Sequence, residues 1–417
     1  TAENSERGRV LTNPFYDPYQ ILVKVYGAGA HLKIALAETP LEELHRTRTV
    51  KTVYGVLEND SYLSLCLRSV APKSPKQTVR IVMKIALYWL IFLGKPKYMV
   101  TDTAVELLKK LGKGGAAGFA NAALRAFDAA KVAVPAGDEG LAATTPYPLF
   151  AIKLLRKEYG DRTESIVRAK SSGVTVRFVR GAESYLSRPH LCTPFPDVYI
   201  FENFARDAAF SVGDYTFQSV GSVAVCAAVE PCGNMLDACA APGGKSVLLA
   251  GKCARVTACE LHEHRVGLIR SYCERMGAEN VTALQKDSSV FDPAFEGAFD
   301  GVLCDVPCSG FGTVSENPDL PLNKTEADLA GLNAVQRAIL ENCSRYVKAG
   351  GALYYSTCSL FGAENDAVVR AFLSAHPEYA AEELASPLAH EKKQCGIQFL
   401  PDTAFGAGFY IAKMRRA

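Results

Sequence analysis

Residues 234–246 read Asn-Met-Leu-Asp-Ala-Cys-Ala-Ala-Pro-Gly-Gly-Lys-Ser, an apolar run followed by a glycine-rich turn and a helix start. The apolar run predicts a buried parallel strand, and the turn predicts the first strand-to-helix connection of a nucleotide-type α/β fold. The glycines allow backbone N–H groups to approach a ligand closely. The three-glycine dinucleotide fingerprint and the longer Gly-x-x-x-x-Gly-Lys phosphate loop are both absent. The shorter loop therefore favours a ligand that carries no phosphate.

Strand and helix patterns alternate from Val223 to the end of the chain. Apolar runs predict strands over 234–239, 255–260, 281–285, 301–305 and 352–357. Amphipathic segments between them predict helices over 245–251, 263–276, 325–347 and 365–375. This alternation is typical of a Rossmann-like α/β fold with a doubly wound parallel sheet. The tail, 397–400 and 408–413, predicts a final antiparallel pair.

Acidic residues follow the predicted strands beside the glycine-rich turn. Glu260 ends the second strand, where an acid accepts hydrogen bonds from ribose hydroxyls. Asp287 follows the third strand and is placed to contact an adenine amino group, and Asp237 anchors either the loop or the amino acid end of the ligand. A Pro-Gly-Gly turn alone would be an ordinary turn. Together with acids at two successive strand ends, it predicts a site for S-adenosylmethionine.

Two cysteine-bearing segments follow the fourth and fifth predicted strands. They are Asp-Val-Pro-Cys-Ser-Gly at 305–310 and Tyr-Ser-Thr-Cys-Ser at 355–359. Cys308 and Cys358 lie in polar turns, unlike Cys304, which we assign to the core. Since the carboxyl ends of parallel strands meet at one edge of a sheet, both thiols are expected to face one site.

Two thiols and the carboxylate of Asp305 suit methylation of cytosine at C5. A thiolate that adds to C6 makes C5 nucleophilic enough to attack an electrophilic methyl group, and the C5 proton must then leave. The reaction needs a nucleophile, a group near the ring nitrogens and a base. A zinc site is the competing interpretation. The chain has no Cys-x-x-Cys pair, and His262-Glu263-His264 alternates at a helix start, so no metal is predicted.

The first part of the chain has a different pattern. Helical spacing covers 19–37, 61–70, 74–93, 101–111 and 115–129, and residues 132–146 predict a linker. Helices over 148–159 and 162–170 and strands over 174–179 and 198–203 then predict a small α+β insert. The expected division is a helical RNA-binding domain at 1–140, a linking and RNA-binding α+β subdomain at 141–222 and a methyltransferase domain at 223–417.

Charge and composition set the class of partner. The net charge is +2, but residues 1–140 hold 19 Lys and Arg against 13 Asp and Glu, whereas residues 231–417 hold 17 against 22. A basic front end suits a polyanion, although a solvated helical surface gives the same count. The most apolar stretch, 81–93, is too short to span a bilayer and carries Lys84. No secretory signal is visible at 1–10, and thirteen scattered cysteines predict reduced thiols in the cytoplasm.

The motifs closely resemble the Nol1/Nop2/Sun family of RNA cytosine-5 methyltransferases. The matching segments are 236–246, 305–312, 336–340, 350–360 with Glu364-Asn365, and more loosely 263–277. Upstream, 101–127 with Asn-Ala-Ala-Leu-Arg at 121–125 is similar to the helical domain of the antitermination factor NusB. The combination implies an S-adenosylmethionine-dependent enzyme that acts on small-subunit (16S) ribosomal RNA. A monomer is expected, without a membrane or metal partner.

The resemblance also implies a role for each matching residue. Cys358 is the implied nucleophile at C6, and Cys308 is the second cysteine that resolves the adduct. Asp305 would hold the base by its ring nitrogen and exocyclic amine, and Lys245 would line the reaction site. The residues implied to bind the cofactor are Ala240, Ala241, Pro242, Gly243, Gly244, Lys245, Glu260, Arg265, Asp287 and Asp305.

Two departures from the family pattern stand out. The family commonly carries two arginines after Gly312, where this chain has Ser315-Glu316, so one phosphate contact is in doubt. The family's Gln-Asp-x-x-Ser appears at 218–222 without its acid, which predicts a different hold on the cofactor's methionine end. A non-catalytic RNA-binding assembly scaffold and methylation of transfer RNA remain alternatives. An amino-group methyltransferase would need Asn/Asp-Pro-Pro-aromatic after the fourth strand, which 305–308 lacks.

Overall fold

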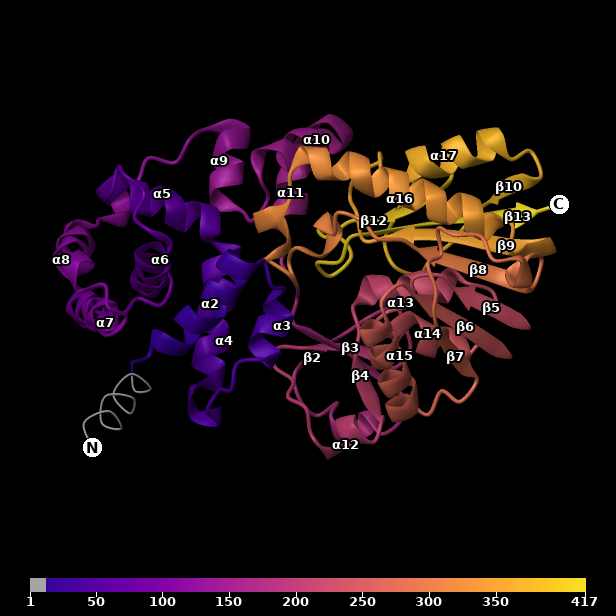
Figure 1. Cartoon of the computed structure of the whole chain (residues 1–417), viewed down its shortest axis with the longest axis horizontal. Coiled ribbons are helices and arrows are strands. Elements are labelled where there is room, and N and C mark those ends of the chain that lie inside the picture. Colours follow the sequence, from indigo (N-terminus) through magenta and orange to yellow (C-terminus); the bar gives the residue numbers. More distant parts are fainter. Residues whose placement is uncertain (1–12) are drawn as a thin grey trace. The chain divides into compact units, whose positions relative to one another are not determined.

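The computed structural model describes residues 13–417 and divides the chain into two compact units (Figure 1). The helical unit holds the chain up to Lys153 together with Asn317–Lys324, and the sheet unit holds Leu154–Glu316 and Thr325–Ala417. The predicted boundaries at 140 and 222 divide the chain differently and stay a prediction. The segment 1–10, for which we predicted no secretory signal, lies outside the described residues.

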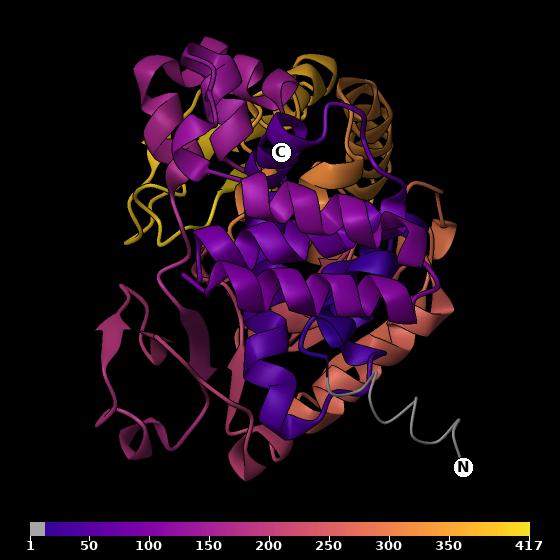
Figure 2. The same ribbon diagram turned by 90° about the vertical axis from the view of Figure 1, so that its left-hand side faces the viewer.

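Residues 13–153 form helices, which Figure 2 shows from a second direction. The helices are α2 (Tyr16–Ala28), α3 (Leu32–Ala37), α4 (Glu43–Glu58), α5 (Asp60–Val70), α6 (Gln77–Ile91), α7 (Lys97–Lys110), α8 (Ala117–Ala126), α9 (Gly137–Thr144) and the start of α10 (Leu149–Tyr159). Helix α6 packs against α2, α4, α5, α7 and α8. Its residues are buried on nearly every side, as expected of a central helix.

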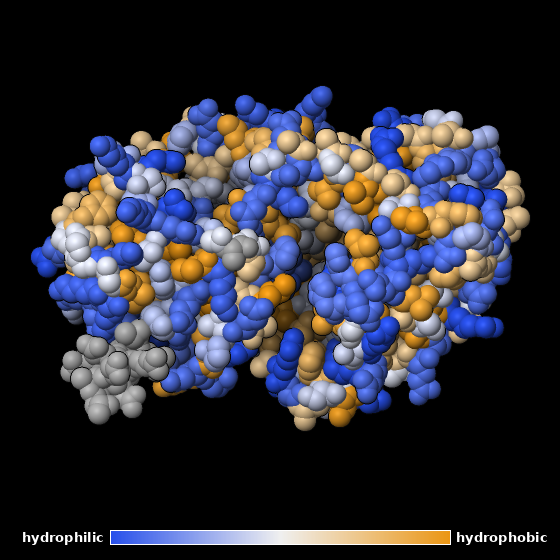
Figure 3. Space-filling model, in the orientation of Figure 1, coloured by the Kyte–Doolittle hydropathy of each residue, from blue (hydrophilic) through white to orange (hydrophobic). Residues whose placement is uncertain are grey.

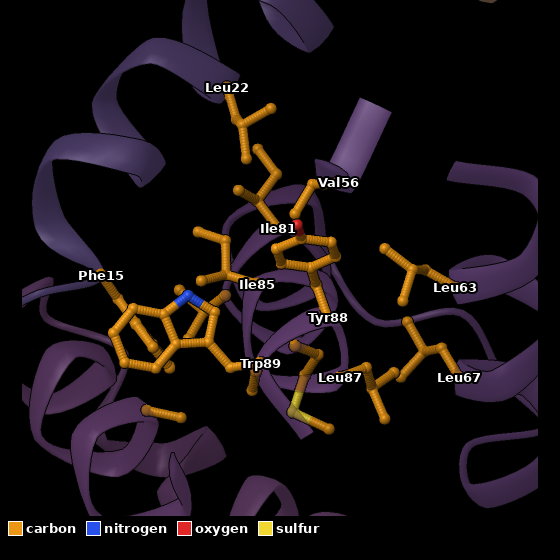
Figure 4. Close-up of a cluster of buried hydrophobic side chains, with 14 of the residues drawn as sticks. Phe15, Leu22, Val56, Leu63, Leu67, Ile81, Ile85, Leu87, Tyr88 and Trp89 are labelled. Carbon is orange, nitrogen blue, oxygen red and sulfur yellow. The ribbon is translucent and has the colours of Figure 1, made fainter. Parts of the chain in front are cut away.

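The core of the helical unit is built around the aromatic residues of α6 (Figure 4). The rings of Trp89 and Phe15 meet edge to face with centroids 4.9 Å apart, and Trp89 Nε1 donates a hydrogen bond to Thr52 Oγ1 at 3.1 Å. The helix predicted over 74–93 is present as α6, and most of its residues are buried. Within residues 13–417, no helix is long and apolar enough to cross a membrane. The face drawn in Figure 3 is a mosaic of hydrophilic and hydrophobic residues.

Three sequence predictions for this unit were wrong. Helix α4 was missed because its core-facing side includes Thr49 and Thr52, which hide the apolar periodicity. The predicted helix 19–37 breaks at Gly29, whose φ of 64° ends α2. The predicted linker 132–146 contains α9, whose Gly140 lets the helix lie against the carbonyl of Pro135.

The segment Asn317–Lys324 belongs to the helical unit although it lies far along the chain. Asp319 Oδ2 accepts a hydrogen bond from Leu32 N at 3.1 Å, and it lies 3.5 Å from His31 Nδ1. Leu322 packs against the helical core. Asp319 therefore acts as the N-terminal cap of α3, because His31 provides no side-chain cap.

The sheet unit begins with helices and a small antiparallel sheet in the order β2-β3-β1-β4. Its elements are α11 (Thr163–Arg168), β1 (Val174–Phe178), β2 (His190–Cys192), β3 (Val198–Phe201), α12 (Ala208–Ser211) and β4 (Tyr215–Phe217). Phe178, Phe201 and Tyr215 form its aromatic core. The strands predicted over 174–179 and 198–203 are confirmed, whereas β2 and β4 were too short to predict.

The main sheet has the order β11-β12-β13-β9-β8-β5-β6-β7, and β10 pairs with β13. Its strands are β5 (Asn234–Asp237), β6 (Arg255–Glu260), β7 (Val281–Gln285), β8 (Phe299–Asp305), β9 (Val347–Thr357), β10 (Tyr379–Glu382), β11 (Glu391–Lys392), β12 (Gly396–Phe399) and β13 (Phe409–Arg416). The helices between and before them are α13 (Val220–Ala228), α14 (Gly244–Ala250), α15 (Glu263–Met276), α16 (Glu326–Ser344) and α17 (Asp366–Ala375). The predicted Rossmann-like sheet is confirmed.

Strand order places the functional edge of this sheet. The five strands from β9 to β7 are parallel, and β5 pairs with β6 on one side and β8 on the other. The chain therefore reverses its winding between β5 and β8. Ligands of open α/β sheets bind outside the carboxyl ends of the strands at such a switch point.

Thr52→Val is expected to destabilise the helical unit by about 1–3 kcal/mol, because the buried Nε1–H of Trp89 loses its acceptor while the side chain keeps its shape. Trp89 is the only tryptophan, so its fluorescence during urea unfolding reports this unit. Thr52→Ser keeps the hydroxyl and is the control. An equal or larger loss in Thr52→Ser would show that the hydrogen bond is not the source of the stability.

Candidate active site

The two cysteine loops meet at the carboxyl edge of adjacent parallel strands. Strands β8 and β9 pair so that Asp305 lies opposite Ser356. The loops that follow carry Cys308 and Cys358, and their sulfurs lie 3.2 Å apart. Both cysteines are half-buried. The structure thus brings together the two thiols on which the sequence interpretation depends.

A single carboxylate inside the fold hydrogen-bonds to both cysteine loops. Glu364 is fully buried. Its Oε1 accepts from Ser309 N at 2.8 Å and from Gln336 Nε2 at 3.0 Å, and its Oε2 accepts from the hydroxyls of Ser309 and Ser359, each at 2.5 Å. Ser309 follows Cys308 and Ser359 follows Cys358. Glu364 therefore fixes the separation of the two loops, a role that sequence analysis did not assign.

Two glycines, Gly312 and Gly408, allow the backbones beside the two cysteine loops to pack directly against each other. Gly312 N donates to Cys358 O at 2.8 Å, and Gly408 N donates to Gly312 O at 2.7 Å. A Cβ on Gly312 would lie 2.0 Å from the carbonyl oxygen of Gly408 and 2.7 Å from that of Cys358. Only glycine fits between these two backbones.

Asp305 and Lys245 form a partly buried ion pair beside the thiols. Lys245 Nζ lies 2.6 Å from Asp305 Oδ2, and Ser356 Oγ donates to Asp305 Oδ1 at 2.7 Å. Burial by itself lowers the pKa of Lys245, but the Asp305 carboxylate and the sulfurs of Cys226 and Cys358 outweigh it, and the pKa is raised. Lys245 is thus a cation that is held in place by Asp305 and is not an exposed side chain at the start of α14.

The environment of the paired sulfurs distinguishes Cys308. The hydrogen bond that Cys308 shares with Cys358, followed by burial and the nearby Glu364 carboxylate, raises the pKa of Cys308 well above its usual range. Cys308 consequently keeps its proton at neutral pH.

The glycine-rich turn at 240–244, together with Asp237, Arg177 and Gln218, forms a group of polar atoms at the end of β5, which we call the cradle. Gly243 has a φ of 107°, and a Cβ there would lie 3.3 Å from the Ile269 Cα. Asp237 Oδ2 accepts from Ser246 Oγ at 2.7 Å, which ties the end of β5 to α14. Within residues 13–417, Asp237 Oδ1 and Arg177 Nη2 are buried and have no hydrogen-bond partner.

These orphaned atoms suit the amino acid end of S-adenosylmethionine. A buried carboxylate oxygen without a donor accepts from an ammonium group, and a buried guanidinium nitrogen without an acceptor donates to a carboxylate. Arg177 is linked to the cradle because its Nε donates to Gln218 Oε1 at 2.9 Å, and Gln218 Nε2 donates to Gly244 O at 3.1 Å. The cradle therefore fits the cofactor. Sequence analysis missed Arg177, whose only signal was a charge inside a short strand.

The other predicted cofactor residues lie at the next two strand ends. Glu260 is buried, and its Oε1 accepts from His262 N at 3.1 Å and from Arg265 Nη1 at 3.3 Å. Arg265 also reaches Ala241 O at 3.5 Å, so it braces the loop. Asp287 is exposed, and its Oδ1 accepts from Ser289 N at 2.9 Å within its own turn. The structure joins Arg265 directly to the loop and Glu260 to the loop through Arg265, whereas Asp287 is bonded within its own turn.

The two departures from the family pattern have local structural explanations. Ser219, in place of the expected acid, accepts from Ser222 N at 3.3 Å and caps α13, as an aspartate would. Ser315 donates to Gly406 O at 2.7 Å and supplies no positive charge. As for metals, the described residues 13–417 contain no group of three His, Cys, Asp or Glu side chains that could hold an ion.

Known proteins match both parts of the chain. Residues 225–415 match the family model of 16S rRNA methyltransferase RsmB/F, and residues 19–129 match the NusB family. The probable ribosomal RNA small subunit methyltransferase B of Bacillus subtilis is 30% identical over 92% of this chain and 94% of that protein. The ribosomal RNA small subunit methyltransferase B of Xanthomonas campestris is 29% identical over 95% and 96%.

Solved structures share the fold. The crystal structure of PH0851 superposes with a TM-score of 0.82 at 20% identity and covers 96% of this chain and 98% of that one. NSun6 from Pyrococcus horikoshii, solved with SFG, has a TM-score of 0.58 at 18% identity and covers 65% of this chain and 98% of that one. At these identities the likeness shows the fold alone.

The sheet carries a site that fits S-adenosylmethionine at its switch point. Together with the family match and the relatives, this site shows that the protein is an S-adenosylmethionine-dependent RNA methyltransferase. Residues 19–129, which match the NusB family, distinguish it from methyltransferases that lack such a helical region. The chain belongs to the ribosomal RNA small subunit methyltransferase B family.

Glu364→Gln is expected to lower kcat by about 100-fold with little change in the KM for S-adenosylmethionine, because the amide nitrogen cannot accept, so two of the four donors lose their acceptor and the sulfurs shift. Methyl transfer to RNA at saturating cofactor measures the effect. Glu341→Gln, on the surface beside His376, is the matched control. Full activity in Glu364→Gln would show that the loops keep their positions without the carboxylate.

Binding of S-adenosylmethionine is expected to weaken about tenfold for each pH unit below 6. Burial raises the pKa of Asp237 to about 6, above its unfolded value of about 3.9. The unliganded fold therefore holds an extra proton between these values, which stabilises it at low pH and is lost as the pH rises through 6. The cofactor's ammonium group needs the deprotonated form, so the proton opposes binding.

Calorimetric titration from pH 5 to 8 measures this dependence. Asp237→Asn should bind weakly at every pH and lose the slope, whereas Glu383→Gln, which is on the surface, should keep it. A slope that survives in Asp237→Asn would assign the proton to another group.

Proposed function

We propose that this enzyme methylates C5 of a cytosine in small-subunit (16S) ribosomal RNA through a covalent adduct between a cysteine and C6. The observation that carries the proposal is the pair of sulfurs, Cys308 and Cys358, 3.2 Å apart at the strand ends beside Asp305. The printed names of the relatives, ribosomal RNA small subunit methyltransferase B, support the ribosomal substrate.

Cys358 is the proposed nucleophile, because the raised pKa of Cys308 makes Cys308 the poorer source of a thiolate and because Cys358 matches the nucleophile that the family resemblance implies. The Cys358 sulfur forms a bond to C6, and the electrons of the C5=C6 double bond make C5 nucleophilic. Bound S-adenosylmethionine supplies the electrophilic methyl group. Asp305 holds the base near its ring nitrogen and exocyclic amine, and Lys245, 2.6 Å from Asp305, balances the charge that develops on the ring.

The adduct is resolved beside Cys308. The C5 proton leaves to a base there, the C5=C6 double bond re-forms, and Cys358 departs as a thiolate. Because both sulfurs lie on loops beyond the ends of β8 and β9, the target cytosine must be unstacked to reach them.

RNA is proposed to be held by the helical unit and by the small sheet before β5. Contacts to phosphate and shape would supply this grip, and the basic excess of residues 1–140 suits it. Ser315 and Glu316 replace a basic pair, so that segment contributes less to phosphate binding than in the family pattern. A ribosomal substrate would place the enzyme in the cytoplasm, and a monomer remains the expected state.

Cys358→Ala should abolish methylation without trapping RNA, and Cys308→Ala should leave a protein–RNA adduct that survives denaturation, since addition proceeds but elimination stalls. Tritium transfer from labelled cofactor and a denaturing gel measure the two effects. Cys192→Ala, exposed and away from any thiol pair, is the control. An adduct on the Cys358→Ala protein would reverse the assignment.

Bisulfite sequencing of RNA from a strain that lacks the gene should reveal one lost 5-methylcytosine in 16S ribosomal RNA. Re-expression of the intact protein should restore it, and the Cys358→Ala variant should not. A lost site in transfer RNA alone would contradict the ribosomal substrate while leaving the chemistry intact. Loss of no site would favour an assembly scaffold.

A further inference from the structure

A second close pair of sulfurs lies at the amino edge of the main sheet, opposite the edge that holds the active site. Cys232 comes just before β5 and Cys253 just before β6. Their sulfurs are 3.5 Å apart, and Cys232 Sγ donates toward Cys253 Sγ. Ala254 N donates to Cys232 O at 3.0 Å, which holds the two turns side by side. The proposed chemistry of methyl transfer does not use this pair.

The pair is more accessible to solvent than the close pair formed by Cys304 and Cys343. Cys232 is half-exposed and lines a hollow of about 240 Å³ together with Lys348 and Arg415. Cys304 and Cys343 are also close, but both are fully buried, and their mutual hydrogen bond followed by burial raises the pKa of Cys304 well above its usual range. A small polar oxidant from solvent therefore reaches the Cys232 end of the pair more readily than it reaches Cys304 or Cys343.

We propose that Cys232 and Cys253 form an oxidation site at which hydrogen peroxide generates a disulfide. Cys253 is the sulfur proposed to react first. It accepts a hydrogen bond from the Cys232 thiol, and Lys252 adds a positive charge, which together with the backbone of Cys232 outweigh burial and lower the pKa of Cys253. A thiolate in such a setting is the reactive form of cysteine.

The reaction balances with one peroxide. The Cys253 thiolate attacks one peroxide oxygen, the O–O bond breaks, and Cys253 becomes a sulfenic acid while hydroxide leaves and takes a proton. The Cys232 sulfur then attacks Cys253, the S–S bond forms, and the sulfenic oxygen leaves as water with the Cys232 proton. Two thiols are oxidised, and one peroxide is reduced to two waters. Because Cys253 is only 5% exposed, a compact oxidant suits it better than a bulky disulfide.

The new bond would enclose the cofactor cradle. The ring closed between residues 232 and 253 contains β5, the glycine-rich turn and the whole of α14. A cross-link of this kind removes extended conformations from the opened state, so local opening of the enclosed segment becomes rarer. The oxidised enzyme should hold the residues around Asp237 and Gly243 more rigidly than the reduced enzyme.

The test treats the full-length protein with hydrogen peroxide at pH 7.5, blocks remaining thiols with N-ethylmaleimide and maps the peptides by mass spectrometry. The expected product is a peptide pair joined through Cys232 and Cys253, which dithiothreitol separates. Cys253→Ser should slow the consumption of the first peroxide by about tenfold, since an ordinary thiol is only a few per cent thiolate near neutral pH. Cys232→Ser should instead leave a sulfenic acid on Cys253 that dimedone captures.

Cys192→Ser is the matched control, because Cys192 is exposed but has no neighbouring thiol, and the cross-link should form in it unchanged. Hydrogen exchange should slow at residues 234–250 of the oxidised wild-type protein and recover on reduction. Oxidation of Cys192 or of the Cys308–Cys358 pair without a 232–253 bond would overturn the proposal. Unchanged exchange in fully cross-linked protein would overturn its effect on the cradle.

Discussion

The Glu364 carboxylate accepts hydrogen bonds from both cysteine loops, and the active site depends on this buried contact. Strand pairing puts Asp305 and Ser356 in register, but it does not constrain the loops beyond the strand ends. Two flexible loops would bring their sulfurs together only at an entropic cost. The four hydrogen bonds to the buried carboxylate offset this loss of entropy when the protein folds. The sulfurs are therefore already 3.2 Å apart before substrate binds.

The same edge of the sheet holds charges that are poor stabilisers of a fold. A partly buried pair such as Lys245–Asp305 loses hydration that its mutual attraction barely repays. Asp237 is fully buried with one oxygen that lacks a donor, and burial raises its pKa to about 6. Groups of this kind gather where a protein binds a charged ligand or stabilises developing charge. Their position at the switch point argues that this edge is organised for chemistry at some expense to stability.

Sequence patterns predicted the elements that depend on local information. The first and last residues predicted for β6, β7 and α15 agree with the structure, because each element is a clear apolar or amphipathic run bounded by turn residues. Helix α4 did not, since its buried face is partly threonine, and its burial is decided by α6. The residues of the candidate site also fall into those that sequence can predict and those that it cannot. Cys308 and Cys358 follow strand ends that can be recognised in sequence, whereas Arg177 gains its place only through contacts made after folding.

The path of the chain adds a constraint that no linear pattern contains. After the Cys308 loop the chain enters the helical unit at Asn317 and leaves it at Lys324, where α16 follows. Asp319 caps α3 within that unit, so the segment is held by a specific hydrogen bond as well as by the packing of Leu322. The Cys308 loop is therefore anchored on one side by β8 and on the other by a segment built into the helical unit.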